Sequence, residues 1–103
     1  MVVIAPTTPY PGWFDILGKV GFPGDGDRLV HHLDALGSRG STFVMTDVTE
    51  ITPTGVQAIR QAVDWAREKR TLLLILLPAR LAASLAELDG LPNLDVVVLD
   101  AAA

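Results

Sequence analysis

Two threonine hydroxyls stand at the start of an expected helix, in the run Thr52-Pro53-Thr54-Gly55. Thr52 occupies the N-cap position, where its hydroxyl can accept a hydrogen bond from a free helix N–H. Pro53 falls at the first helical position, where its missing N–H costs nothing. Because a helix start is partly positive and Gly55 leaves it uncrowded, Thr52 and Thr54 form a candidate site for anion binding or phosphorylation. A purely structural helix start explains the same residues equally simply.

Three other groups of residues suggest chemistry less strongly. His31 and His32 are adjacent on an expected helix, about 100° apart, and no cysteine or carboxylate cluster joins them at metal-ligand spacing, so we interpret them as a solvated pair. Residues 21–27 are rich in Gly, Pro and Asp, but they lack the Lys-Ser/Thr of a phosphate loop and the closing Glu of a calcium loop. Asp47 ends an expected strand, yet no acidic pair follows the first strand, as a phospho-receiver would require.

The composition favours one folded domain that is not an enzyme. The chain has 103 residues, half of them apolar, and no cysteine, which excludes disulfides and thiol chemistry. The net charge of −4 disfavours nucleic-acid binding. No apolar run reaches the about 20 residues that span a bilayer, and the first residues lack a basic leader, so we expect a cytoplasmic protein. We see no catalytic constellation and expect no cofactor and no metal.

The chain alternates strand and helix patterns after an initial pair of strands. The expected strands are 2–4, 13–20, 42–45, 71–77 and 94–99, and the expected helices are 27–36, 53–69 and about 78–89. Asp27 is the expected N-cap of the first helix and Gly37 its C-cap. The run 72–77 is apolar on both faces, which is typical of a parallel sheet covered on both sides. We therefore predict a single α/β domain over residues 1–103, with a mixed, mostly parallel sheet.

The helix over 53–69 has a regular amphipathic pattern. Val56, Ile59 and Val63 share its apolar face. Its opposite arc is polar and includes Gln57, Arg60, Gln61 and Asp64. Trp65 lies at the edge of the apolar arc, where it could serve a homodimer contact.

The second half of the chain resembles the STAS domain, the module of sulfate transporters and anti-sigma factor antagonists. The resemblance rests on an apolar strand that leads to an aspartate, a hydroxyl-Gly motif that opens an amphipathic helix, a strand followed by a helix that begins with Pro, and a Gly-Leu turn before a last strand. The matching residues are 43–49, 52–56, 72–77, 78–81 and 90–98. The spacing from Asp47 to Gly55 needs no gap.

The resemblance implies a function in partner switching. In anti-sigma factor antagonists, a kinase of the histidine-kinase ATPase type phosphorylates the first Ser or Thr after the aspartate of the motif. The unmodified form binds that kinase and frees a sigma factor. Here Thr52 replaces the motif's aspartate, and Pro53, which cannot accept phosphate, occupies the usual acceptor position. Either Thr54 or Thr52 takes over, or the domain docks constitutively, as do STAS subunits bound to the ATPase of lipid-transporting ABC systems.

These considerations define an expected partner-binding face. It comprises Asp47, Thr49, Thr52, Pro53, Thr54, Gly55, Gln57, Arg60, Gln61 and Asp64. Simple solvation explains the polar arc of the helix equally well. A small-molecule sensor is a third class, but no convergent set of polar anchors supports it. The resemblance also implies a Gly before the penultimate strand, whereas this chain runs from Arg70 directly into Thr71.

Overall fold

The computed structural model describes residues 2–6, 12–35 and 40–99, which form six strands and three helices. The elements, in chain order, are β1 (Val3–Pro6), β2 (Trp13–Val20), α1 (Asp25–Ala35), β3 (Ser41–Val44), β4 (Val48–Ile51), α2 (Pro53–Glu68), β5 (Leu73–Pro78), η1 (Ala79–Leu88) and β6 (Leu94–Leu99). The third helix, expected as an α-helix, is a 3₁₀-helix. The expected Gly37 cap lies outside the described residues.

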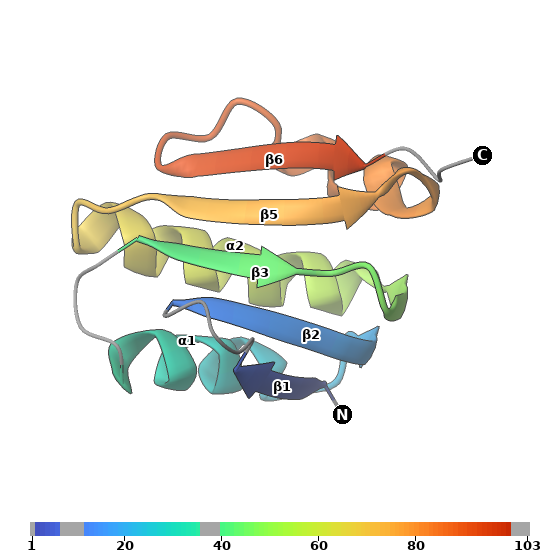
Figure 1. Cartoon of the computed structure of the whole chain (residues 1–103), viewed down its shortest axis with the longest axis horizontal. Helices are drawn as coiled ribbons and strands as arrows, with labels where there is room; N and C mark the ends of the chain where they lie inside the picture. The colour runs from blue at the N-terminus through green and yellow to red at the C-terminus, as the bar shows by residue number, and fades with distance from the viewer. Residues whose placement is uncertain (1, 7–11, 36–39, 100–103) are drawn as a thin grey trace.

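The strands form one mixed sheet in the order β1-β2-β3-β5-β6, with β4 beside β2. Only β1 is antiparallel to its neighbour, and the other pairs are parallel (Figure 1). This confirms the α/β prediction with a mostly parallel sheet. The carboxyl ends of β2, β3, β5 and β6 consequently point the same way, which gathers the segments that follow them along one end of the sheet.

The strand β4 was not expected, because residues 48–51 were interpreted as part of a strand-to-helix connection. Val48 and Ile51 are buried, whereas Thr49 and Glu50 are exposed, so the segment lacks strict alternation. It pairs with the second half of β2, while β3 pairs with the first half. The register shifts next to Gly18, whose φ of +80° is readily adopted by glycine.

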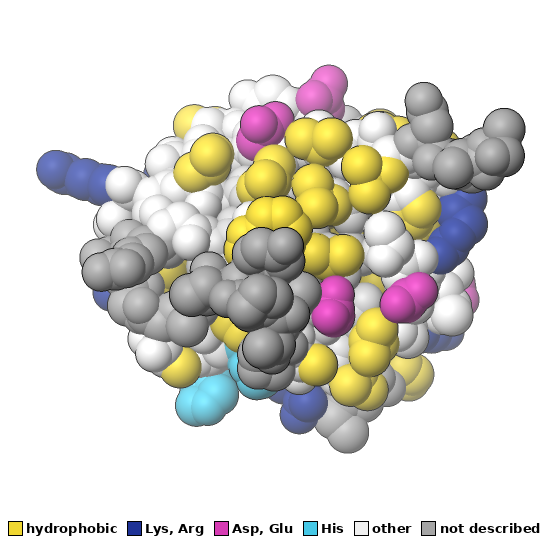
Figure 2. Space-filling model, in the orientation of Figure 1, with side chains coloured by type: hydrophobic (Ala, Val, Ile, Leu, Met, Phe, Trp, Pro, Cys, Tyr) yellow, Lys and Arg dark blue, Asp and Glu magenta, His cyan; other side chains and the backbone are white. Residues whose placement is uncertain are grey.

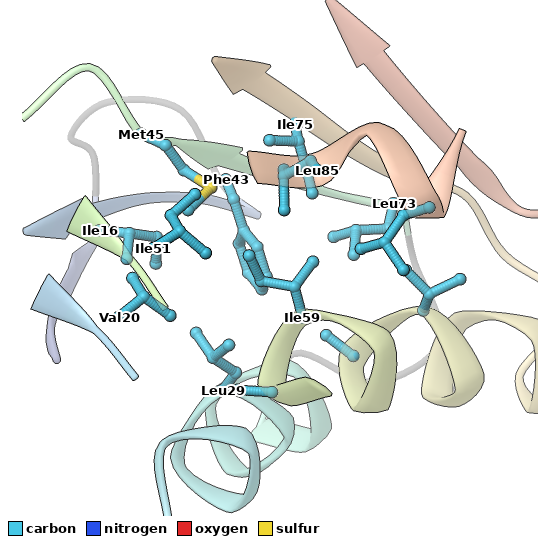
Figure 3. Close-up of a cluster of buried hydrophobic side chains, with 14 of the residues drawn as sticks. Ile16, Val20, Leu29, Phe43, Met45, Ile51, Ile59, Leu73, Ile75 and Leu85 are labelled. Carbon is cyan, nitrogen blue, oxygen red and sulfur yellow. The ribbon is translucent and has the colours of Figure 1, made fainter. Parts of the chain in front are cut away.

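The three helices lie on one face of the sheet (Figure 1). The core fills the space between the sheet and these helices, where Phe43, Ile59 and Leu29 meet (Figure 3). On β5, Leu73 faces this core, whereas Leu74 faces the other side and is only half-buried. The expectation that both sheet faces are covered is therefore wrong for the described elements. Figure 2 shows hydrophobic side chains gathered over the strands of the face without helices.

Candidate functional site

The start of α2 has the predicted geometry. Thr52 is the N-cap residue in an extended conformation, and its Oγ1 accepts a hydrogen bond from the Gly55 N–H at 3.2 Å. Pro53 is the first helical residue. The carbonyl of Thr52 accepts the first helical bond from the Val56 N–H at 2.9 Å. The Thr52 hydroxyl therefore has a structural task, because it satisfies one of the N–H groups that a helix start leaves free.

The start of α2 packs closely against Val20, at the end of β2, and against the following Gly21. The Thr52 N–H donates to the Val20 carbonyl at 3.0 Å. A Cβ added at Gly55 would lie 2.0 Å from that same carbonyl oxygen, and one added at Gly21 would lie 1.9 Å from Thr52 Oγ1. Only glycine fits at these two positions, so the first turn of α2 is held in a fixed place.

The two candidate hydroxyls differ in accessibility. Thr52 is half-buried between Gly21 and the first turn of α2, and its oxygen is engaged in the cap. Thr54 is exposed at the second helical position. A modifying enzyme could reach Thr54 without opening the cap, and a phosphate there would lie within the positive first turn. The structure therefore separates a structural hydroxyl from an accessible one.

The polar arc of α2 contains an exposed ridge, and two residues of the arc contact the neighbouring helices. Thr54, Gln57 and Asp64 are exposed along the helix. Gln61 lies on the same ridge, but its Nε2 donates to Asp27 Oδ1 on α1 at 2.6 Å. Arg60 is 3.8 Å from Glu87 on η1.

These two contacts link α2 to the helix on each side of it. The arc is therefore not a uniformly solvated face. Its exposed residues Thr54, Gln57, Gln61 and Asp64 form a ridge with α1 on one side and η1 on the other. We call this surface the α2 ridge.

Asp47 and Thr49 do not join the α2 ridge. Asp47 lies in a turn closed by a bond from the Val48 N–H to the Met45 carbonyl at 3.2 Å. The strand β4 then lies between Asp47 and Thr52. Thr49 is exposed within β4. Thr49 was expected on a loop and is instead a strand residue, whereas the place of Asp47 and Thr49 on a partner-binding face stays a prediction.

Phe22 is an exposed residue that the sequence analysis missed. It directly follows Gly21, which contacts Thr52, and 41% of its surface is exposed. The Lys19 Nζ lies 5.6 Å from the centroid of the Phe22 ring and 3.8 Å from Glu50. Exposed aromatic side chains frequently anchor protein interfaces. An aromatic residue inside a Gly-Pro-Asp loop was the signal available in the sequence.

A buried carboxylate fixes the loop that carries Phe22. Asp25 is 1% exposed and accepts hydrogen bonds from the N–H groups of Gly21 at 3.0 Å, Phe22 at 2.9 Å and Val2 at 3.3 Å. Burial by itself favours the neutral carboxyl, but these three donors outweigh it and lower the pKa of Asp25. The prediction of Asp27 as N-cap is wrong, since α1 already begins at Asp25.

The histidine pair shows no arrangement for metal binding. His31 is exposed, and the half-buried His32 packs edge-to-face on Phe14 with ring centroids 5.7 Å apart. Burial and the neighbouring His31 and Arg28 lower the pKa of His32. Within the described residues, no group of three His, Cys, Asp or Glu side chains is placed to hold a metal ion.

Comparisons with known proteins add no family assignment, because the scan against protein-family models and the search of curated proteins both find no match for this chain. None of the helices in the described part of the chain is long and apolar enough to cross a membrane.

Trp65, which was considered for a dimer contact, is buried and its Nε1 donates to Asp34 Oδ1. It is therefore not available for such a contact.

Proposed function

We propose that this chain is a non-enzymatic, STAS-like docking domain whose partner binds the α2 ridge. The observation that carries the proposal is the exposure of Thr54 on a helix start that Gly21 and Gly55 hold against β2. A docking surface needs groups in fixed positions, because ordering them on binding would cost affinity. Phe22, next to the Gly21 that contacts Thr52, adds an exposed apolar side chain near the start of α2.

A phosphate on Thr54 would switch this surface. It adds a charge between −1 and −2 at neutral pH, and the positive first turn of α2 stabilises that charge within the domain. The same charge changes what a partner meets at the N-terminal end of the ridge. The fold would therefore tolerate the modification while binding is lost.

The partner class follows from the resemblance to anti-sigma factor antagonists. We propose a cytoplasmic anti-sigma factor of the histidine-kinase ATPase type, which binds the unmodified domain, releases a sigma factor and phosphorylates Thr54. Thr54 would take the role of the usual acceptor, because Pro53 occupies the acceptor position in this chain. Thr52 is the poorer acceptor, because its oxygen already accepts the Gly55 N–H.

A constitutive docking subunit is the alternative function. It is favoured by Pro53, because a chain that lacks the usual acceptor has no need of a kinase. In that case the α2 ridge would bind one partner permanently, for example the ATPase of an ABC transport system. Both functions use the same surface, but only the first requires a hydroxyl at position 54.

Phosphorylation in vitro distinguishes the two functions. The domain and its Thr54→Ala and Thr52→Ala variants would be incubated with ATP and a kinase-type anti-sigma factor from the same organism. Intact mass and fragmentation then locate any phosphate. We expect one phosphate on Thr54 in the wild type and none in Thr54→Ala. Stable binding without phosphate in all three proteins would support the constitutive subunit instead.

A further inference from the structure

The last strand, β6, forms one margin of the sheet (Figure 1). Among the described strands it pairs with β5 alone. The Leu73 N–H donates to the Asn93 carbonyl at 2.9 Å, and this bond determines which residues of β6 bond to β5. Because alternate residues of a parallel strand bond to opposite sides, Asp95 and Val97 direct their backbone groups to β5. Val96 and Val98 therefore direct theirs to the free margin.

A groove of about 280 Å³ lies beside this margin on the helix side of the sheet. Val96 and Val98 of β6 line it together with Leu85 and Ala86 of η1. Val98 is 46% exposed there, because η1 does not cover the end of β6. On the opposite face of the strand, Val97 is 40% exposed. The margin therefore offers apolar contacts on both faces as well as free backbone groups.

The charged side chains on this margin are carboxylates. Asp89 lines the groove and Asp95 lies on the opposite face of β6, and both are exposed. Neither forms an ion pair with another described residue. Residues 94–99 contain no Lys and no Pro, the residues with which edge strands are commonly protected against pairing. The margin is thus unprotected and acidic.

We propose that β6 binds an extended, basic segment of a protein partner, which adds to the sheet as a further strand. Backbone groups of that segment would bond to Val96 and Val98, as in other cases of strand addition to a sheet edge. An apolar side chain would fill the groove, and Lys or Arg at the alternate positions would meet Asp95 on the opposite face of β6. Charge disfavours a second copy as the occupant, because it would bring two further carboxylates to this edge.

This interface is separate from the α2 ridge and does not depend on the proposed function. The probe is an acetylated, amidated octapeptide that alternates valine with lysine, titrated into the full isotope-labelled chain. We expect amide shifts at Val96, Val98 and Ala86, and none at Thr54. A matched peptide with glutamate in place of lysine should bind at least about tenfold more weakly, because like charges then face each other.

Two variants test the contacts separately. Asp95→Asn removes the exposed charge on the face where the lysines would lie, and it should weaken the lysine peptide about two- to fivefold without affecting the fold. Val98→Pro removes a donor that faces the free margin and leaves the β5 ladder intact, so it should weaken both peptides about fivefold at an unchanged melting temperature.

Three results would overturn the proposal. The first is equal affinity for the two peptides, and the second is a set of shifts confined to the start of α2. The third is a wild-type dimer in sedimentation that Val98→Pro dissociates, because the occupant would then be a second copy. If Val98→Pro does not fold, Asp95→Asn and the peptide pair still decide the outcome.

Discussion

At the scale of single residues, two glycines and two threonines determine what the start of α2 can do. Gly55 allows the helix backbone to approach the Val20 carbonyl, Gly21 leaves room for the Thr52 side chain, and Thr52 uses its hydroxyl as a cap. Thr54 is left exposed. The neighbouring hydroxyls thus have different roles because of tertiary contacts that local sequence does not reveal.

Gly55→Ala should destabilise the domain strongly. The added Cβ would lie 2.0 Å from the Val20 carbonyl oxygen, which is backbone and cannot rotate away. We expect a loss of about 3 kcal/mol in the free energy of unfolding, measured by urea denaturation. Thr54→Ala, one position away and exposed, serves as the control and should change stability by less than about 0.5 kcal/mol. Equal stability of the two variants would contradict the close approach described here.

At the scale of elements, α2 ends in a left-handed turn without a glycine. Arg70 has a φ of +55°, its N–H donates to the Arg67 carbonyl at 3.1 Å, and the Thr71 N–H donates to the Ala66 carbonyl at 2.9 Å. These two bonds define a Schellman motif, in which glycine is the usual residue at the left-handed position. At the position before β5 where the resemblance implies a glycine, this chain therefore has Arg70 in a strained backbone conformation.

Arg70→Gly should stabilise the domain. Glycine adopts a positive φ without the steric cost of a Cβ, although it also raises the entropy of the unfolded chain. We expect a net gain of about 0.5 kcal/mol in the free energy of unfolding, measured by thermal or urea denaturation. The matched control is Lys69→Gly, at a residue with a φ of −84°, which should lose stability by about 1 kcal/mol. A loss in both variants would show that Arg70 is not strained.

The elements that the sequence predicted are those with a regular period. The bounds of β2 and β6 agree with the expected strands, and α2 agrees to within one residue. The strand β4 was missed because its buried residues, Val48 and Ile51, are three positions apart and do not alternate. That omission also placed Thr49 on a loop, whereas it is a residue of β4.

The candidate site was predicted in its local part only. Capping by Thr52 depends on neighbouring residues, so the pattern was sufficient. The approach of Gly21 to Thr52 joins residues far apart in the chain, and no local pattern predicts it. The value of Phe22 as an anchor depends on the same approach. For this reason the exposed aromatic in the loop that contacts Thr52 came to light only in the structure.

At the scale of the whole molecule, one buried carboxylate joins distant parts of the chain. Asp25, at the start of α1, holds the N–H groups of Val2, Gly21 and Phe22. It thereby links the first strand region, the loop after β2 and α1. Because Gly21 of that loop contacts Thr52, the same carboxylate also supports the loop against the start of α2.

Asp25→Asn should reduce stability in a pH-dependent way. The pKa of Asp25 is lowered in the folded state, so its contribution is fully present above the unfolded pKa, near 3.8, and is lost as pH falls through the lower folded pKa. We expect a deficit of about 3 kcal/mol in the variant at neutral pH. Unfolding free energies measured at neutral pH and at successively lower pH should converge. A deficit that stays constant with pH would contradict the charged hydrogen bonds.

The central claim is that a protein partner docks on the α2 ridge around Thr54. Its most direct test is the affinity of a kinase-type anti-sigma factor for the wild type, Thr54→Glu and Asp89→Asn, measured by isothermal titration without ATP. We predict that Thr54→Glu weakens binding at least about tenfold, because it places a charge at the exposed start of the ridge, while Asp89→Asn on the β6 margin binds like the wild type. Unchanged binding by Thr54→Glu, with the domain folded, would contradict the account.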